Sequence, residues 1–224
     1  MSDVPYNISG DDETKDGKIV KKGNPYMKGK VGLDFGDWDK GNFIVDDWIR
    51  AVTPKVKDNG QIIIFNSFKN ISKMAITLFE EGWMVKGTYY WHKPNPMPHM
   101  PEIFPLSATE QYILVVKDLD NYTVNTRKGN EKMVETGRLD ASSHEDQKKR
   151  FHTTQKPLSM WKSLVEIHSN EGDIVLDSFS GSAVNAVACI ELGRNFIGTE
   201  LDDDYFQKGN DRIEKALKLT PPLF

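Results

Sequence analysis

The sequence has almost no cysteine and no long apolar run. Cys189 is the one cysteine among 224 residues, so an internal disulfide is excluded and a reducing, cytoplasmic compartment is expected. It lies in the helix-like stretch NAVACIELG, which predicts a buried packing thiol rather than a nucleophile. No apolar stretch approaches the roughly 20 residues that span a bilayer. No signal-peptide pattern precedes the first polar turn, so we expect no membrane partner.

Two further absences limit the ligands. The sequence contains no G-x-G-x-x-G, and therefore lacks the spacing that cradles the pyrophosphate of a dinucleotide. The five histidines and the single cysteine are scattered without metal-ligand spacing, so no metal site is predicted. The net charge of −4 provides no global positive field, and any binding of nucleic acid must depend on local basic patches.

Alternating strand and helix patterns predict an α/β fold with a mainly parallel sheet covered on both faces. Continuous or alternating apolar patterns predict strands over 60–67, 84–93, 109–118, 172–177 and 195–202. Helical spacing predicts helices over 42–52, 69–83, 156–170, 182–193 and 202–219. The strands at 84–93 and 109–118 flank a proline-rich loop and predict an antiparallel edge hairpin. The polar, glycine-rich segment 11–30 is interpreted as a mobile surface loop.

The clearest chemical signal is the stretch DIVLDSFSGSAVNAV, in which a strand ends in Asp177 and a tight turn leads into a helix. Ligands of open α/β sheets bind beyond the carboxyl ends of strands, where such turns lie. Gly181 permits a close approach of backbone to ligand, and Ser180 and Ser182 are candidates for capping the helix. Glu200, nineteen residues after Gly181, is placed to accept hydrogen bonds from ribose hydroxyls. The pattern favours a nucleoside without phosphates; the alternative is an ordinary β–α turn with capping serines.

Three motifs in order resemble those of the β-class amino-methyltransferases of DNA. They are SDVPYN at 2–7, HTTQKPL at 152–158 and LDSFSGSA at 176–183, which are similar to D-P-P-Y, H-P-T-Q-K-P and D-P-F-x-G-S-G-T-T. The stretches GLDFGDWDKGNF and WHKPNPMP also resemble adenine-modifying members. The resemblance covers essentially the whole chain. It implies a Rossmann-like methyltransferase fold, S-adenosylmethionine (SAM) as cofactor, double-stranded DNA as partner and a bacterial or phage-infected cell as the location.

The resemblance also implies how the amino-terminal motif works. An exocyclic amino group is a poor nucleophile because its lone pair is delocalised into the base. Asp3 and the backbone carbonyl of Val4 are expected to accept its two hydrogens and to direct the lone pair toward the methyl group. Tyr6 is expected to stack on a base rotated out of the duplex. Pro5 stiffens the turn by fixing its own φ.

On the cofactor side, the resemblance implies a site around the methionine and ribose moieties of SAM. Glu200 would hold the ribose, and a second segment would line the site from the opposite side. The expected cofactor-binding residues are Asp177, Phe179, Ser180, Gly181, Ser182, Asn185 and Glu200 together with Gln155, Lys156 and Pro157. By the same resemblance, 1–117 is the catalytic half of one domain, 118–150 the target-recognition region and 151–224 the SAM-binding half.

The sequence departs from the family pattern in both motifs. Ala183, Val184 and Asn185 replace the usual G-T-T, and because alanine is excluded from the freest backbone angles we expect weak SAM affinity. Only Met1 and Ser2 precede Asp3, where relatives have a buried strand beside the one ending at Asp177. We therefore expect a large apolar gap in the sheet and poor activity of the chain alone. A truncated chain, a rearranged sheet, and a homodimer or second chain that completes the sheet all remain open.

Several functions are compatible with these motifs. Adenine N6 is favoured because Asp begins the catalytic turn, whereas cytosine-N4 relatives more often begin it with Ser. The alternatives are a cytosine-N4 enzyme, a methyltransferase of RNA or protein amino groups, and a non-catalytic descendant that binds DNA or a partner. Basic residues at 127, 128 and 148–150 offer phosphate contacts, although each singly is also typical of a solvated loop. His92 and His99 are interpreted as surface residues.

Overall fold

The computed structural model describes residues 1–6, 12–15, 18–21, 43–94, 96, 108–125, 138–142, 150–152 and 154–220. Several sequence predictions fall outside these residues. They are the family-like stretch at 32–43 except for Phe43, His99, Thr153 of the HTTQKPL motif, and the basic residues Arg127, Lys128, Lys148 and Lys149.

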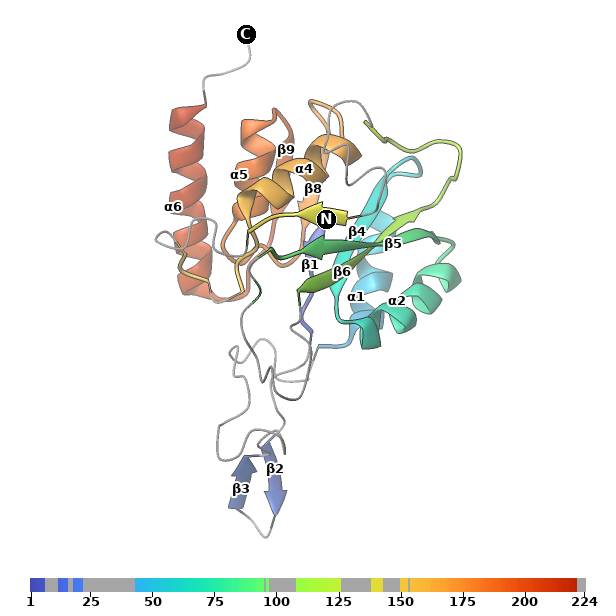
Figure 1. Ribbon diagram of the computed structural model, residues 1–224, viewed down its shortest axis with the longest axis vertical. Coiled ribbons are helices and arrows are strands. Elements are labelled where there is room, and N and C mark those ends of the chain that lie inside the picture. Colours follow the sequence, from blue (N-terminus) through green and yellow to red (C-terminus); the bar gives the residue numbers. More distant parts are fainter. Residues whose placement is uncertain are drawn as a thin grey trace.

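A five-stranded sheet forms the centre of the molecule, in the order β1-β4-β6-β5-β7 (Figure 1). Its strands are β1 (Ser2–Asp3), β4 (Gln61–Asn66), β5 (Met84–His92), β6 (Thr109–Val116) and β7 (Arg138–Asp140). The pairs β1–β4 and β5–β7 are parallel, and β6 runs antiparallel to both of its neighbours. A second, parallel sheet consists of β8 (Ile174–Asp177) and β9 (Asn195–Gly198).

The two-residue strand β1 connects these sheets. The amino group of Met1 donates to the carbonyl of Leu176 on β8 at 2.7 Å, and the Ser178 amide donates to Ser2 Oγ at 3.1 Å. Asn185 donates from one Nδ2 to the Met1 carbonyl and to Asp177 Oδ2. Because Met1 lies beside Leu176 and Ser2 beside Ser178, β1 runs in the same direction as β8. The Asp3–Tyr6 turn thus follows a strand that lies between β4 and β8.

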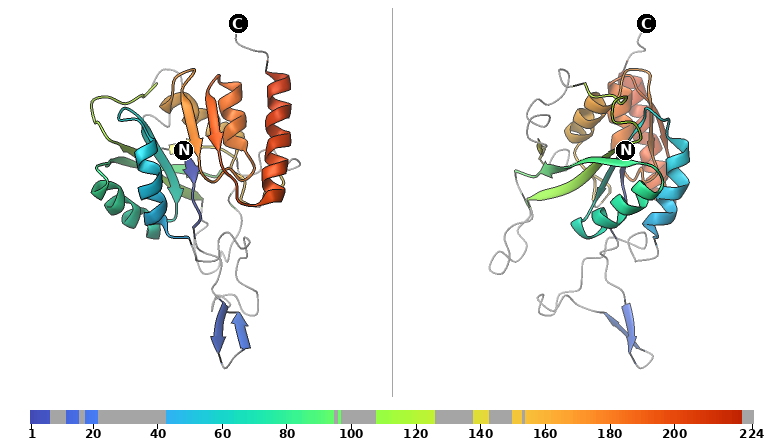
Figure 2. Two further views of the ribbon diagram at one scale, coloured as in Figure 1. Left: turned by 180° about the vertical axis from the view of Figure 1, so that it is seen from behind. Right: turned by 90° about the vertical axis from the view of Figure 1, so that its right-hand side faces the viewer.

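Helices cover both faces of this arrangement (Figure 2). On one face, α1 (Val45–Val52) and α2 (Phe68–Glu80) pack over a cluster that includes Ile64, Met74 and Ile113. On the other face, α4 (Leu158–His168) and α5 (Val184–Glu191) pack on a cluster that includes Phe65 and Leu164, and α6 (Asp203–Leu219) lies against α5. The short 3-10 helix η2 (Thr53–Lys55) follows α1. None of the helices in the described part is both long and apolar enough to cross a membrane.

The α/β prediction is confirmed, and all five predicted helices and five predicted strands are present with ends shifted by a few residues. Two local predictions were wrong. The segment interpreted as a loop contains an antiparallel hairpin of β2 (Asp12–Lys15) and β3 (Lys18–Lys21). The β5–β6 hairpin does not form the edge, because β7 pairs with the outer side of β5. Three residues are too few to give β7 a periodic signal.

The expected large apolar gap beside β4 is not found among the described residues. Ile62 and Ile63 of β4 are buried, as is Val175 of β8. At the start of β4, the Gln61 side-chain amide donates to the carbonyls of Thr123 and His168, so polar groups join β4 to the end of α4. The segment that contains Thr123 is also held by the Asn125 amide, which donates to the Ile167 carbonyl. Ile174 alone of the β8 side chains remains largely exposed, at 61%.

Asn185 provides a test of how strongly β1 depends on its side-chain hydrogen bonds. We expect Asn185→Ala to lower the free energy of unfolding by about 2–3 kcal/mol, because the buried carboxylate of Asp177 and the Met1 carbonyl each lose a donor. Urea denaturation measures this change, with the exposed Asn121→Ala as the control. Equal stabilities of the two variants would contradict this role of Asn185.

Candidate active site

Two asparagines hold the turn that follows β1. Asn66, the last residue of β4, donates from Nδ2 to the carbonyls of Val4 and Pro5, each at 3.2 Å. Asn70 in the first turn of α2 donates to the carbonyl of Tyr6 at 3.2 Å and to Asn66 Oδ1 at 2.8 Å. The Val4 carbonyl keeps a second lone pair for a further donor. The backbone of the Asp3–Tyr6 turn is therefore fixed by β4 and α2.

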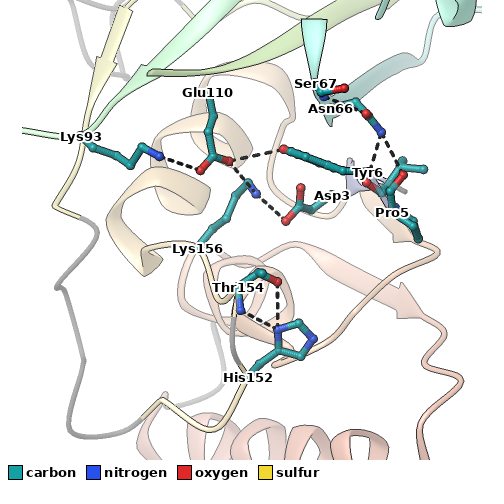
Figure 3. Close-up of polar contacts among 11 residues, drawn as sticks. Asp3, Pro5, Tyr6, Asn66, Ser67, Lys93, Glu110, His152, Thr154 and Lys156 are labelled. Carbon is teal, nitrogen blue, oxygen red and sulfur yellow. Dashed lines mark hydrogen bonds and ion pairs between the residues drawn. The ribbon is translucent and has the colours of Figure 1, made fainter. Parts of the chain in front are cut away.

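Four charged side chains alternate in sign across the site (Figure 3). Lys156 Nζ lies 2.5 Å from Asp3 Oδ2 and 3.1 Å from Glu110 Oε2. Lys93 Nζ lies 3.0 Å from Glu110 Oε1. The Tyr6 hydroxyl donates to Glu110 Oε2 at 3.4 Å, a long and therefore weak bond. The row contains two acids and two lysines and carries no net charge when all four are ionised.

Lys156 is the most enclosed member of this row. Its side chain is 5% exposed. The ammonium group lies 5.2 Å from the centroid of the Phe65 ring, 5.5 Å from that of Tyr6 and 5.9 Å from that of Trp91. Aromatic faces attract a cation at these distances. Three rings and two carboxylates together compensate the burial of this charge.

The enclosure changes the acidity of each group. Burial raises the pKa of Asp3 to about 6, although Lys156 opposes the rise. Burial would also raise the pKa of Glu110, but Lys156 and Lys93 outweigh it and lower that pKa to about 2. The pKa of Lys156 is raised, because Asp3 and Glu110 more than offset its burial. At neutral pH all three groups are therefore ionised, and Asp3 is the one whose pKa lies closest to neutrality.

One oxygen of Asp3 has no hydrogen-bond partner among the described residues. Lys156 occupies Oδ2, whereas Oδ1 is buried and accepts no hydrogen bond from this part of the chain. A buried, unpaired carboxylate oxygen is unfavourable, and such atoms in folded proteins usually have a functional reason. Oδ1 is thus an acceptor ready for an N–H donor that is brought into the site.

The turn after β8 is held tightly against β9. Glu200 Oε2 accepts from the Gly181 amide at 2.6 Å, and Oε1 accepts from the amides of Leu201 and Asp202. Because a carboxylate offers about four acceptor positions, roughly one remains for a ribose hydroxyl. Gly181 has φ +49, and a Cβ at this position would lie 3.2 Å from His152 Nε2. Glycine is therefore required here both for its backbone conformation and for its small size.

The start of α5 differs from what the sequence predicts. Its N-cap is Ala183, and no side chain caps the helix, so the prediction that Ser180 and Ser182 cap it was wrong. Ser180 Oγ donates instead to the Asp177 carbonyl. Ala183 adopts φ +55 although alanine disfavours that region. Alanine thus adopts the left-handed conformation at the start of α5, and its Cβ faces Gly209 of α6.

Three residues that were expected to bind the cofactor contact other groups of the protein instead: Asp177, Phe179 and Asn185. Asp177 is 2% exposed; its Oδ1 accepts from the Phe179 amide and its Oδ2 from Asn185. The Phe179 ring packs against Phe43 at 5.2 Å and Trp48 at 5.7 Å between centroids. Asn185 is equally buried and joins β1 to the turn. These residues form the frame of the turn.

The segment Gln155–Pro157 lies near the turn that follows β8, and its lysine points to Asp3. Arg212 of α6 donates to Gln155 Oε1 at 3.2 Å and to the Ser182 carbonyl at 2.7 Å, and so ties α6 to both segments. Pro157 is the N-cap residue of α4. Thus the structure brings the amino-terminal turn, the QKP segment and the β8 turn to one edge of the sheet.

Sequence reasoning missed Asn66, Asn70, Lys93 and Glu110. Glu110 is the second residue of β6, which runs antiparallel to β4, so the first residues of β6 lie at the edge where the parallel strands end. A charged residue at the start of the apolar run TEQYILVV is the signal that could have pointed to it.

Comparison with known proteins identifies the class of protein. The family model of the N6/N4 DNA methylases matches residues 1–211, and the chain belongs to this family. The Type II methyltransferase M2.DpnII of Streptococcus pneumoniae is 28% identical over 96% of this chain and 81% of its own length. M2.MboI of Moraxella bovis is 27% identical over the whole chain and 81% of its own length.

Solved structures agree. The M1.HpyAVI–SAM complex has 36% sequence identity and a TM-score of 0.69, covering 75% of this chain and 81% of that chain. The cytosine-N4-specific PvuII DNA methyltransferase has a TM-score of 0.59 at 15% identity, over 83% of this chain and 79% of that chain, and shares the fold. The chain is therefore a SAM-dependent DNA methyltransferase. The acceptor position that the described contacts of Glu200 leave over, and the lack of a side chain on Gly181 itself, fit a nucleoside cofactor.

Gly181 can be tested against a matched glycine. Gly181→Ala and Gly172→Ala both place alanine at positive φ, but only at residue 181 does the added Cβ meet another side chain. We expect both to destabilise the fold by about 1–2 kcal/mol, and only Gly181→Ala to weaken SAM binding, by roughly tenfold or more. Equilibrium dialysis and denaturation measure the two effects. SAM affinities that fall equally in both variants would argue against Gly181 at the cofactor.

Proposed function

We propose that this enzyme methylates the exocyclic N6 amino group of adenine in double-stranded DNA, on a base rotated out of the helix. The observation that carries the proposal is Asp3 Oδ1, a buried acceptor at the start of the Asp3–Tyr6 turn that has no hydrogen-bond partner among the described residues. Asp in the first position of this turn resembles the adenine-N6 members of the family. Relatives named Type II methyltransferases support a place beside a restriction endonuclease.

The residues of the chain act mainly by positioning. Asp3 Oδ1 accepts one hydrogen of the amino group, and the free lone pair of the Val4 carbonyl accepts the other, so the nitrogen lone pair is directed away from both. The ring of Tyr6 stacks on the flipped base, and Asn66 and Asn70 keep the turn rigid. Bound SAM supplies an electrophilic methyl group. Alignment of the two reacting atoms accounts for most of the rate.

The cofactor assignments remain part of this proposal. Gly181, Ser182 and Glu200 would line the nucleoside, with Gln155 and Pro157 opposite. Asp177, Phe179, Ser180 and Asn185 would act indirectly, because their polar atoms or rings support the turn. Lys156 would act on Asp3 rather than on the cofactor, given its 2.5 Å ion pair.

The reaction is tested by transfer of a labelled methyl group from SAM to DNA. We expect incorporation by the unaltered chain and a loss of at least about 100-fold in Asp3→Asn, which keeps the shape but replaces an acceptor by a donor. The exposed Asp120→Asn is the matched control. Nucleoside digestion should yield N6-methyladenine.

Other products would contradict the proposal in specific ways. N4-methylcytosine would favour the cytosine enzyme. Methylation of RNA or a peptide in preference to duplex DNA would favour the enzymes of the same architecture that act on those substrates. Binding of DNA without transfer would favour a non-catalytic descendant. Incorporation unchanged by Asp3→Asn would remove Asp3 from the mechanism.

The activity should depend on the ionisation of Asp3. Its pKa is raised to about 6, so the carboxylate that accepts the amino hydrogen is present above pH 6 and is lost as the pH falls through that value. We expect kcat/KM for DNA to fall about tenfold per pH unit below the pKa. A profile that stays flat to pH 5, measured at constant ionic strength, would exclude Asp3 as the essential acceptor.

A further inference from the structure

We infer that Glu110 is a positioning residue for methyl transfer: it holds Lys156 on one oxygen of Asp3 and so keeps the other oxygen open to the amino group. The inference rests on the proposed function, because it gives a role to the same acceptor. Glu110 itself touches neither Asp3 nor the turn that follows β8, and acts through Lys156.

The first step is the geometry of the ammonium group. Lys156 reaches the site from the segment before α4, and its Nζ lies between two carboxylates that come from β1 and β6 (Figure 3). An ammonium group has three donors that rotate freely. With Glu110 drawing one of them, Lys156 contacts Asp3 through Oδ2 alone. Without that second anion, Asp3 is the one carboxylate left among the described contacts of Nζ, and the three aromatic rings do not direct Nζ to a single oxygen of Asp3.

The second step is the balance of charge around Asp3. The groups that face it are Lys156, Glu110, Tyr6 at the end of its own turn and Asp177 at the end of β8. Lys93, at the end of β5, binds the other oxygen of Glu110. Lys93 thereby limits how strongly Glu110 competes for Lys156. Lys93, next to the end of β5, thus affects the contact between Lys156 and Asp3 through Glu110 of β6.

The third step separates this role from simple stabilisation. Breaking a buried ion pair that only supported the fold would change stability, and loss of the Glu110 charge would also shift the Asp3 titration directly, but neither effect would lower the rate once Asp3 is fully ionised. A positioning role links Glu110 and Lys93 to Asp3 with opposite signs. Removing the negative charge of Glu110 favours the Asp3 carboxylate, and removing the positive charge of Lys93 disfavours it.

The test is a carboxyl carbon-13 NMR titration of Asp3 in the full chain, which requires no turnover. We expect Glu110→Gln to move the Asp3 titration down by about one pH unit and Lys93→Gln to move it up by roughly half a unit. Glu171→Gln, on the exposed loop before β8, and Lys86→Gln, on β5 just before Lys93 in the chain, are matched controls and should not move it. If Glu110→Gln does not fold, Lys93→Gln carries the test: an Asp3 titration and an acid limb that both stay in place overturn the role.

Methyl-transfer kinetics provide the second measurement. In Glu110→Gln we expect the acid limb of the kcat profile to move down with the NMR titration, while the plateau falls about tenfold because Lys156 is free to cover the acceptor oxygen. The KM for DNA should change little. Lys93→Gln should move the acid limb upward.

The possible outcomes distinguish the positioning role of Glu110 from the proposed methylation itself. Opposite shifts in the two variants, with a lowered plateau in Glu110→Gln, support the positioning role. Shifts absent from both variants, or equal to those of the controls, overturn it while leaving methylation of adenine untouched. An active parent enzyme whose Glu110→Gln plateau equals its own would also overturn it. A parent chain without methyl transfer would overturn the proposed function, and with it this role.

Discussion

The buried ammonium group of Lys156 is the interaction on which the candidate site depends. A charge at this depth is tolerated only where counter-charges and hydrogen-bond acceptors surround it, and here they come from β1, β6 and three aromatic rings. Each of these parts is therefore constrained by the same atom. Asp3 is held by one oxygen, Glu110 is drawn inward beside the Tyr6 hydroxyl, and the QKP segment is fixed at the entry of α4. The open oxygen of Asp3 is a consequence of this sharing rather than a separate feature.

A second constraint concerns how the two-residue strand β1 is held in place. Two residues offer few ladder hydrogen bonds, so the strand is held mainly by its surroundings: parallel pairing with β4, the amino group of Met1 on β8, and the Asn185 amide. Asn66 then fixes the carbonyls that follow. Backbone and side-chain donors from three elements replace the regular pairing of a longer strand. The contacts that hold β1 and the Asp3–Tyr6 turn consequently also hold the turn that follows β8.

Much of this architecture could be predicted from the sequence, because periodic patterns over ten or more residues are strong signals. The helices α2 and α4 follow their apolar spacing, and Gly82 and Gly193 stop helices at positive φ as expected. The motifs also located Asp3 and Gly181. Glu110 was not assigned from its charge at the start of an apolar run, since its place in the site depends on the pairing of β6 with β4, a tertiary fact. Nor could the use of Lys156 or the left-handed Ala183 be predicted: the first depends on convergence of distant segments, and the second on packing that overrides a residue's backbone preference.

The pKa of Asp3 also says what kind of ligand suits this site. Two lysines and two acids cancel, yet burial still raises the pKa of Asp3 to about 6, so the carboxylate remains short of stabilising positive charge. A cation bound beside it supplies that charge and lowers the pKa. By linkage, the ionised carboxylate must favour the cation by the same free energy. A sulfonium cofactor carries such a charge, and an uncharged nucleoside of equal shape does not. If the methyl donor binds beside Asp3, its binding and the readiness of the acceptor oxygen would be coupled through this carboxyl group, before any base enters the site.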